Sequence, residues 1–242
     1  KTPAIMAQLE IEYTDGRRLA PFLRGSQWSV ERRNFAALTT KAALAWRDTL
    51  ARLGAEVLAS EAWLKGEWSG IAVHGQTDLI LGLPGDRLLV VDYKRSSSRK
   101  RLTQMQKGFD SQASLYRAMI ASGGPKDPRK AALAARLRGA QQTGVVYYLL
   151  NDQVALSDTV LVGAAAVPGW RVVEGDIAGE ALARIGQRIA EVRSGKLALN
   201  RAGDQEFFEK KAGLTPYALQ KSPLIGLFSL PDEETEAGEE AS

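Results

Sequence analysis

The chain has 242 residues, enough for one large domain or two small ones, and its hydrophobic share of 45% and charged share of 25% are typical of a globular protein with a core. Because it contains no cysteine and one histidine, the sequence excludes disulfides, thiolate nucleophiles, iron–sulfur clusters and histidine-rich metal sites. A metal would therefore need oxygen ligands, which favours magnesium or manganese.

Charge is distributed unevenly along the chain. The net charge is +4, but the last twelve residues contain six acids and no base, so removing these six negative charges leaves +10 on the rest. A basic body favours a polyanionic partner, most simply nucleic acid, although a basic protein that merely stays well solvated has the same composition.

The hydrophobic pattern predicts no membrane partner. No window approaches 18 uncharged apolar residues, and we expect a cytoplasmic protein. The N-terminus lacks an initiator methionine and an apolar signal core, which suggests a piece of a longer polypeptide.

The first half of the chain predicts one helix and then three strands. Apolar residues at intervals of three and four predict the helix over 29–53, and Gly54 ends it. The strands are predicted over residues 56–64, 71–81 and 87–95. A tight turn around Pro84-Gly85 joins the last two strands into a hairpin.

The second half predicts helices on either side of one buried strand. The basic segment 95–107 has three serines and a high charge, which predict a mobile loop. Helices are then predicted over 109–120, 129–139 and 177–193, and a buried strand over 144–150. The acidic composition of 229–242 predicts a disordered tail.

This order of elements predicts an α/β fold with a central mixed sheet flanked by helices. The short connections between the first strands favour antiparallel neighbours, and the helix before 144–150 allows a parallel one. We expect a single domain over 1–228, with its core at about 29–150.

The predicted hairpin brings two acids together. With the turn near Gly85, opposed residues have numbers that sum to about 170, so Asp78 and Asp92 face each other. Side chains alternate along a strand, which places Lys94 on the face of Asp92 and Tyr93 on the other face. A shift of one residue in the turn would break this cluster.

Opposed carboxylates repel each other, and a divalent cation would compensate. Magnesium binds one or two carboxylates and keeps its other positions for water and phosphate. The ion would acidify a water and neutralise charge on the phosphate, while Lys94 could orient that water or stabilise the same charge. This chemistry suits phosphodiester hydrolysis. The alternative is that these are solvated residues at strand ends.

Three motifs in order resemble the RecB-type branch of the PD-(D/E)xK nucleases. That branch is marked by a Gly-x-x-Asp strand, an (Asp/Glu)-x-Lys strand and a Gln-x-x-x-Tyr helix. The motifs here read Gly75-Gln-Thr-Asp78, Asp92-Tyr-Lys94 and Gln112-x-x-x-Tyr116. The resemblance covers about residues 55–150 and implies the restriction-endonuclease-like core of that superfamily, with the order αβββαβ.

The resemblance implies metal-dependent cleavage of DNA, as the exonuclease domain of a recombination or repair enzyme. Asp78, Asp92 and the backbone carbonyl of Tyr93 would bind Mg²⁺ or Mn²⁺, and Lys94 would be the catalytic lysine. Gln112 and Tyr116 lie one helical turn apart and would contact the DNA backbone or order the site, or would simply pack.

The chain departs from this branch in its histidine. Many members carry a metal-binding histidine on a helix well upstream of the first aspartate, whereas His74 lies four residues before Asp78 on the same strand. His74 could be a spare ligand or a phosphate partner, although we expect a half-buried strand histidine. Either a truncated chain has lost the upstream helix or another residue substitutes, and Glu61 is a candidate third acid. Without cysteine, the chain cannot carry the iron–sulfur cluster of some relatives.

Basic residues after Lys94 are expected to neutralise DNA phosphates, with binding that weakens as salt rises. These residues are Arg95, Arg99, Lys100, Arg101 and Lys107. Trp63, Trp68 and Trp170 could stack bases, although large aromatic side chains more often lie in a core or at its rim. Members of this branch commonly work beside a helicase, so a helicase domain or subunit is a second expected partner.

Two other interpretations remain open. A nuclease-like fold could bind DNA or scaffold a complex without cleaving, and the absent upstream histidine supports this alternative. An interaction module that never contacts nucleic acid would explain the fold, but not the acids, the lysine and the basic segment.

Overall fold

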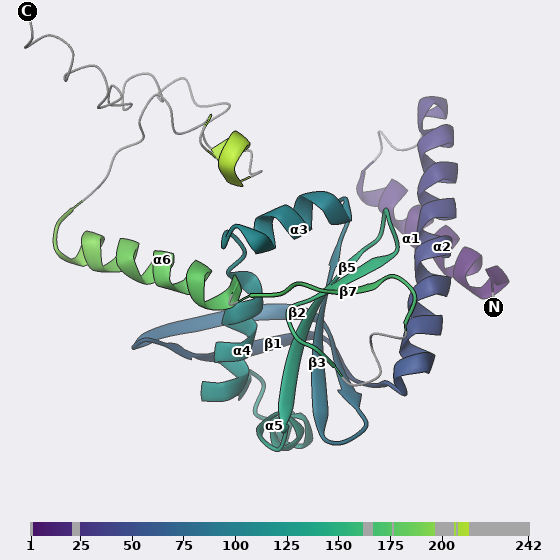
Figure 1. The fold of residues 1–242 in the computed structure, drawn as a ribbon. Helices are drawn as coiled ribbons and strands as arrows, with labels where there is room; N and C mark the ends of the chain where they lie inside the picture. The colour runs from purple at the N-terminus through teal and green to yellow at the C-terminus, as the bar shows by residue number, and fades with distance from the viewer. Residues whose placement is uncertain are drawn as a thin grey trace, which may run out of the picture. The chain divides into compact units, whose positions relative to one another are not determined.

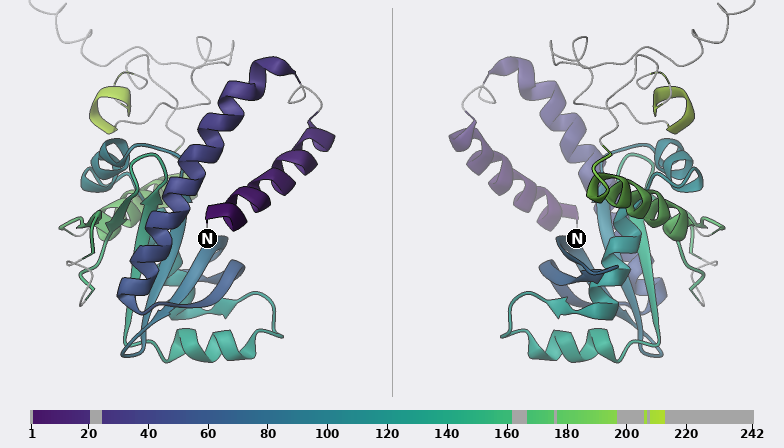
Figure 2. Two further views of the ribbon diagram at one scale, coloured as in Figure 1. Left: turned by 90° about the vertical axis from the view of Figure 1, so that its right-hand side faces the viewer. Right: turned by 90° about the vertical axis from the view of Figure 1, so that its left-hand side faces the viewer.

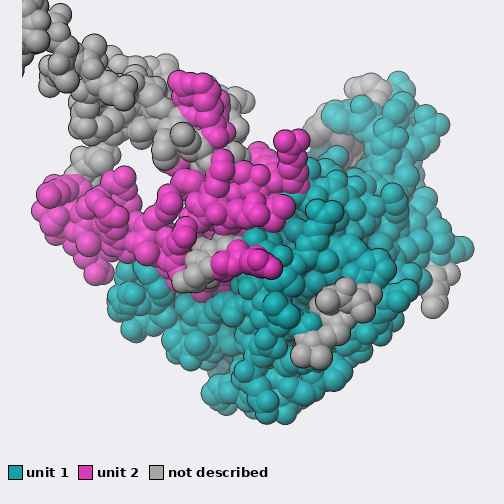
Figure 3. Space-filling model, viewed as in Figure 1, with its two compact units in different colours: residues 1–98, 115–173 teal, residues 99–114, 174–242 magenta. Residues whose placement is uncertain are grey.

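The computed structural model describes residues 2–20, 25–161, 167–175, 177–196, 206 and 208–212. The chain divides into two compact units, one formed by 1–98 and 115–173 and the other by 99–114 and 174–242 (Figure 3). The predicted single domain over 1–228 stays a prediction, and the predicted tail over 229–242 lies outside the described residues.

A seven-stranded mixed sheet forms the centre of the first unit (Figure 1). In spatial order its strands are β4 (Gly124–Pro125), β1 (Glu56–Trp68), β2 (Ile71–Leu83), β3 (Arg87–Lys94), β5 (Gln142–Leu149), β6 (Val154–Ser157) and β7 (Trp170–Val172). The first three long strands are antiparallel neighbours, and β5 pairs with β3 in parallel. The predicted α/β fold with its mixed sheet is confirmed, while the three short strands β4, β6 and β7 were not predicted.

One face of the sheet packs on α2 (Ser29–Leu53), the helix that the sequence predicts. Its residues Ala42, Trp46 and Leu53 are buried at helical spacing and join Leu79 and Leu81 of β2 in one core cluster. The helix ends where Gly54 adopts a left-handed φ of 60°, as a glycine after a helix commonly does.

Other helices complete the first unit. They are α1 (Thr2–Leu19), a 3-10 turn (Ser26–Trp28), α5 (Ala131–Arg138) and all but the first three residues of α4 (Gln112–Ser122). The predicted starts of α4 and α5 were two or three residues early. The views in Figure 2 place α2 and α4 on opposite sides of the sheet. The helix α1 was not predicted, because most of its residues are exposed and its sequence carries no strong apolar stripe.

The sheet forks between β2 and β3. Their antiparallel pairs run from Leu83 with Arg87 to Leu79 with Val91, so opposed numbers sum to 170 and the predicted register is confirmed. Beyond the last pair, β2 continues with β1 as its partner as far as Ile71, and β3 continues with β5 as far as Lys94. We call the two diverging strand segments the arms of the fork. The first residue beyond the last pair is Asp78 on the β2 arm and Asp92 on the β3 arm.

Beyond the fork, β1 and β2 form a ribbon, edged by the short β4 at Leu64 and Lys65, that packs on α4 with one face. β1 continues to Trp68, so the predicted end at residue 64 was wrong. Gly66 and Gly75 face Met119 of α4, and the Ser122 hydroxyl donates to the Glu67 carbonyl at 2.9 Å. The close approach requires a residue without a side chain at Gly66.

The second unit contains most of α3 (Ser98–Gln106), together with α6 (Ile177–Arg193) and a π-helical turn (Phe208–Ala212). The bounds of α6 are those predicted. The predicted mobile loop over 95–107 was wrong, because α3 occupies most of it. The segment has no helix-breaking residue, and an ion pair joins the partly buried Arg101 of α3 to the buried Asp110 at 2.7 Å.

None of the helices in the described part of the chain is both long and apolar enough to cross a membrane.

We expect Gly66→Ala to lower the free energy of unfolding by about 2 kcal/mol, because its Cβ would lie 2.6 Å from the Cα of Met119. Urea denaturation followed by circular dichroism measures the change. Gly16→Ala in α1 is the control: its Cβ meets no described atom within 4 Å, and we expect a neutral or slightly stabilising effect. Equal destabilisation in both variants would contradict the close approach at Gly66.

Candidate active site

Asp78 and Asp92 lie at the mouth of the fork, one on each arm. Asp92 is 3% exposed, and Asp78 is partly buried. The backbone N–H of Tyr93 donates to Oδ2 of Asp78 at 2.6 Å. This bond replaces the main-chain bond that a continuing ladder would have supplied, so it fixes the Asp78 carboxylate beside β3.

Lys94 forms an ion pair with Asp92, and the distance from Nζ to Oδ2 is 2.7 Å. Alternation along β3 places both side chains on one face, as predicted. A buried carboxylate without a partner is strongly unfavourable, so the ammonium group is what permits a charged Asp92 at this depth. The Lys94 side chain is 27% exposed, so it is also accessible from solvent.

Tyr116 links the two arms of the fork. Its hydroxyl lies 2.9 Å from the Gln76 carbonyl of β2, to which it donates, and 3.3 Å from Oδ1 of Asp92 on β3. Tyr116 is 3% exposed. The side chain that the sequence assigned to DNA contact or to ordering the site therefore lies in contact with Asp92.

Tyr93 presents only its backbone to the acids. Its ring lies on the opposite face, with its centroid 6.2 Å from those of Trp46 and Tyr148. Burial raises the pKa of Tyr93 to about 12, and the negative charge of Asp78 acts in the same direction. Because the N–H and C=O of one strand residue point to the same side, the Tyr93 carbonyl points toward the arm that carries Asp78.

Glu61 occupies an irregular position of β1. Its neighbours Ser60 and Ala62 pair with Leu79 and Thr77, so the register places Glu61 opposite Asp78. Its φ of 48° lies in the left-handed region, which is rare for a residue with a side chain and recurs near functional sites. Glu61 is thus the acid of β1 nearest to Asp78 in the register, at a position where the strand is irregular.

The acids do not form a closed metal cage. Among the residues that the structure describes, no three acids or histidines come together closely enough to hold one ion. The fork itself presents two carboxylates and the Tyr93 carbonyl. Such an all-oxygen donor set fits magnesium or manganese, which retain several waters.

His74 is exposed, so the predicted half-buried histidine was wrong. The ribbon of β1 and β2 packs on α4 with its other face only, and the His74 ring lies 6.3 Å from that of Trp63. Both helices upstream of β1 lack histidine. Trp170 lies in the core, as most large aromatic side chains do, and Trp68 is partly buried.

The predicted DNA-binding residues are divided between the units. Arg95 belongs to the first unit and lies over the Phe35 ring at 5.6 Å. The others belong to the second unit, and Arg101 is paired there with Asp110. Gln112, also in that unit, begins α4, and its N–H donates to the Asp110 side chain at 3.3 Å. Contact between these second-unit residues and the acids stays a prediction.

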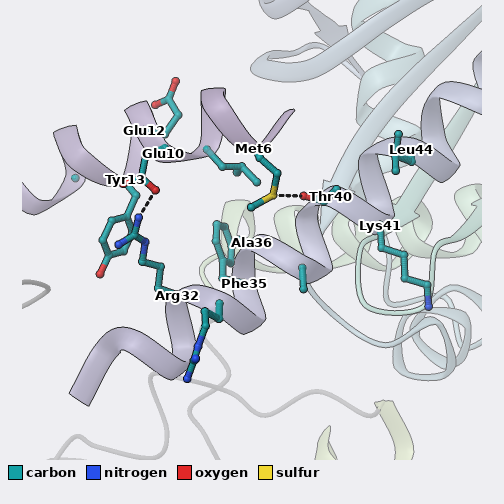
Figure 4. Close-up of a pocket in the computed structure, with 14 residues that line it drawn as sticks. Met6, Glu10, Glu12, Tyr13, Arg32, Phe35, Ala36, Thr40, Lys41 and Leu44 are labelled. Atoms are coloured by element: carbon teal, nitrogen blue, oxygen red, sulfur yellow. Dashed lines mark hydrogen bonds and ion pairs between the residues drawn. The ribbon is translucent and has the colours of Figure 1, made fainter. Parts of the chain in front are cut away.

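A hollow of about 830 Å³ between α1 and α2 contains none of the predicted site residues (Figure 4). Figure 4 shows Arg32 between Glu10 and Tyr13, and the Thr40 hydroxyl donates to the Met6 sulfur at 3.2 Å. Its mainly apolar lining does not suit a metal ion or a phosphate.

A family model of the PD-(D/E)XK nuclease superfamily matches residues 5–211. The chain belongs to this superfamily. Its seven-stranded sheet is the restriction-endonuclease-like fold, and the matched range contains the fork and all three motifs. Nucleases of this superfamily typically use divalent metal ions, in agreement with the oxygen donors here. A search of curated proteins found no match to the chain.

We expect Mn²⁺ to raise the melting temperature of the protein by several degrees at saturating concentration, since binding to the folded state alone stabilises it. Asp78→Asn and Asp92→Asn should each lose most of this metal-induced shift, measured by differential scanning fluorimetry. Asp86→Asn in the exposed β2–β3 turn is the matched control and should keep it. An undiminished shift in both site variants would place the ion elsewhere.

Proposed function

We propose that this protein is a magnesium- or manganese-dependent deoxyribonuclease whose reaction centre is Asp78, Asp92 and Lys94. The observation that carries the proposal is the buried Asp92 carboxylate, ion-paired with Lys94 where the sheet forks and opposite Asp78. Metal-dependent hydrolysis of a phosphodiester needs carboxylates that bind the metal ion and a cation near the phosphate. The two acids and the lysine at the fork supply both.

In this proposal, Asp78, Asp92 and the Tyr93 carbonyl hold the metal. When bound, the ion supplies Lewis acidity that lowers the pKa of a coordinated water and offsets negative charge on the phosphate. Glu61 is a candidate additional acid because it lies opposite Asp78 in the register. His74, on the same strand as Asp78, is a candidate phosphate partner.

In this proposal Lys94 both neutralises Asp92 and contacts the reacting water or phosphate. Its ammonium neutralises Asp92, and its partial exposure lets it reach a water or a phosphate oxygen at the mouth of the fork. A lysine ammonium has three donors, so it can keep the Asp92 contact while it orients the attacking water. The charge that develops on the phosphate then lies next to a fixed cation.

The remaining features support DNA as the substrate. The chain outside its acidic end carries +10, and α3 contributes Arg99 and Lys100 as exposed cations within a few residues of Lys94. The motif order supports membership of the RecB-type branch, hence an exonuclease of recombination or repair in the cytoplasm, working beside a helicase domain or subunit. A DNA-binding module without cleavage is the competing function.

End-labelled linear DNA, single- and double-stranded, tests the proposal. We expect degradation with Mg²⁺ or Mn²⁺, none with EDTA, and at least a 100-fold loss of rate in Asp92→Asn and Lys94→Arg. The arginine keeps the charge beside Asp92, so its loss of activity cannot be ascribed to an unpaired buried acid. Asp86→Asn and Lys41→Ala should cleave like the parent protein. Salt-sensitive binding without cleavage by either metal would favour the binding module.

Tyr116→Phe tests whether the tyrosine positions Asp92. Removing the hydroxyl should lower kcat about 10-fold while leaving KM nearly unchanged, because the ring keeps its packing and the Asp92 carboxylate loses a contact. The metal concentration that gives half-maximal rate should rise in the same variant. A change in KM alone would assign Tyr116 to DNA contact instead.

A further inference from the structure

The ribbon of β1 and β2 leaves one face open beyond the fork. On β1, Ala62 and Leu64 are fully buried, whereas Trp63 and Lys65 between and beyond them are exposed. On β2, the exposed residues are Ala72, His74 and Gln76. This alternation is that of an antiparallel ribbon with one packed face and one solvated face.

Trp63 is a large aromatic side chain that is 47% exposed on this open face. Its backbone is held on both sides, by Gln76 of β2 and by the Lys126 N–H, which donates to the Trp63 carbonyl at 2.8 Å. The indole therefore stands on a fixed segment of sheet. Core packing does not account for it.

The groups around the indole suit a nucleotide. The Lys126 ammonium lies 5.6 Å from the centre of the ring, and the His74 ring lies 6.3 Å away with an interplanar angle of 33°. Lys65, paired with His74 in the register, adds a second exposed cation. An aromatic face bordered by cations is how proteins bind a base together with its phosphate.

The open face leads to Asp78. Side chains alternate along β2, so His74, Gln76 and Asp78 share one face of that strand. Trp63 is directly opposite Gln76, which makes Asp78, two residues further along β2, its diagonal neighbour. A base bound on Trp63 would thus belong to a nucleotide next to the phosphate at the fork.

We propose that Trp63 is a stacking platform for an unpaired DNA base beside the reaction centre, with Lys126 binding the adjacent phosphate. The proposal rests on the nuclease function proposed above and adds that the strand at the fork is single-stranded, because a base inside a duplex has both faces covered by its neighbours. Stacking on one aromatic ring is worth roughly tenfold or more in affinity.

The test compares a fluorescein-labelled oligothymidylate with the same oligonucleotide carrying abasic residues throughout, by fluorescence anisotropy in EDTA. Trp63→Ala should bind the oligothymidylate about 10-fold more weakly and the abasic strand with unchanged affinity. Trp63→Phe should keep most of the oligothymidylate affinity. Lys126→Ala should weaken binding of both strands and lower the slope of log affinity against log salt concentration by about one. Val57→Ala, an exposed apolar residue on the same strand, is the control.

Equal weakening of both strands in Trp63→Ala, or no weakening, would overturn the proposal and leave the indole as a surface contact of Lys126. DNA cleavage by the parent protein distinguishes a failure of the stacking proposal from a failure of the nuclease proposal. If the parent degrades DNA and Trp63→Ala binds and cleaves like it, the platform fails while the nuclease function stands. If the parent neither binds nor cleaves DNA, both fail.

Discussion

The burial of one carboxylate beside another is the constraint on which this structure depends. Asp92 is almost inaccessible, and Asp78 lies across from it at the end of the β2–β3 pairing. Two such charges repel, and each would be costly to bury alone. The protein offsets the cost with the Lys94 ammonium on Asp92 and the Tyr93 N–H on Asp78. Both compensating groups come from β3, so one short strand arranges the whole site.

The fork is maintained by packing on the arm that diverges. The ribbon can diverge from β3 because it packs on α4 instead. Gly66 lies against Met119 of that helix, and the Ser122 hydroxyl is hydrogen-bonded to the backbone of Glu67. Tyr116 from the same helix then returns to the mouth of the fork and contacts both arms. The helix thus supports the ribbon and holds Asp92 at once. The left-handed Glu61 lies where the ribbon diverges, as irregular strand positions often do beside active sites.

Membership of the PD-(D/E)XK nuclease superfamily gives these features a common purpose. Because β2 and β3 separate at the fork, Asp78, Asp92 and the backbone of Tyr93 come together at one edge while the core packing of the sheet is kept. In the proposed stacking role, the open ribbon face beyond Asp78 would extend that site along β2, where its exposed indole and cations would bind an unpaired strand. The core on the α2 face remains closed, and burial raises the pKa values of its partly buried Tyr93 and buried Tyr148 to about 12.

The sequence by itself determined the elements that depend on local pattern. The helix 29–53, its glycine stop, the hairpin register and the shared face of Asp92 and Lys94 follow from periodicity and from one turn, so they could be predicted. Only the tertiary structure decided that 98–106 is a helix, that His74 and Trp63 are exposed, and that Tyr116 contacts Asp92. These outcomes depend on which face of the ribbon α4 covers. That choice is made by contacts between residues some fifty positions apart, such as Glu67 with Ser122, which no local pattern contains.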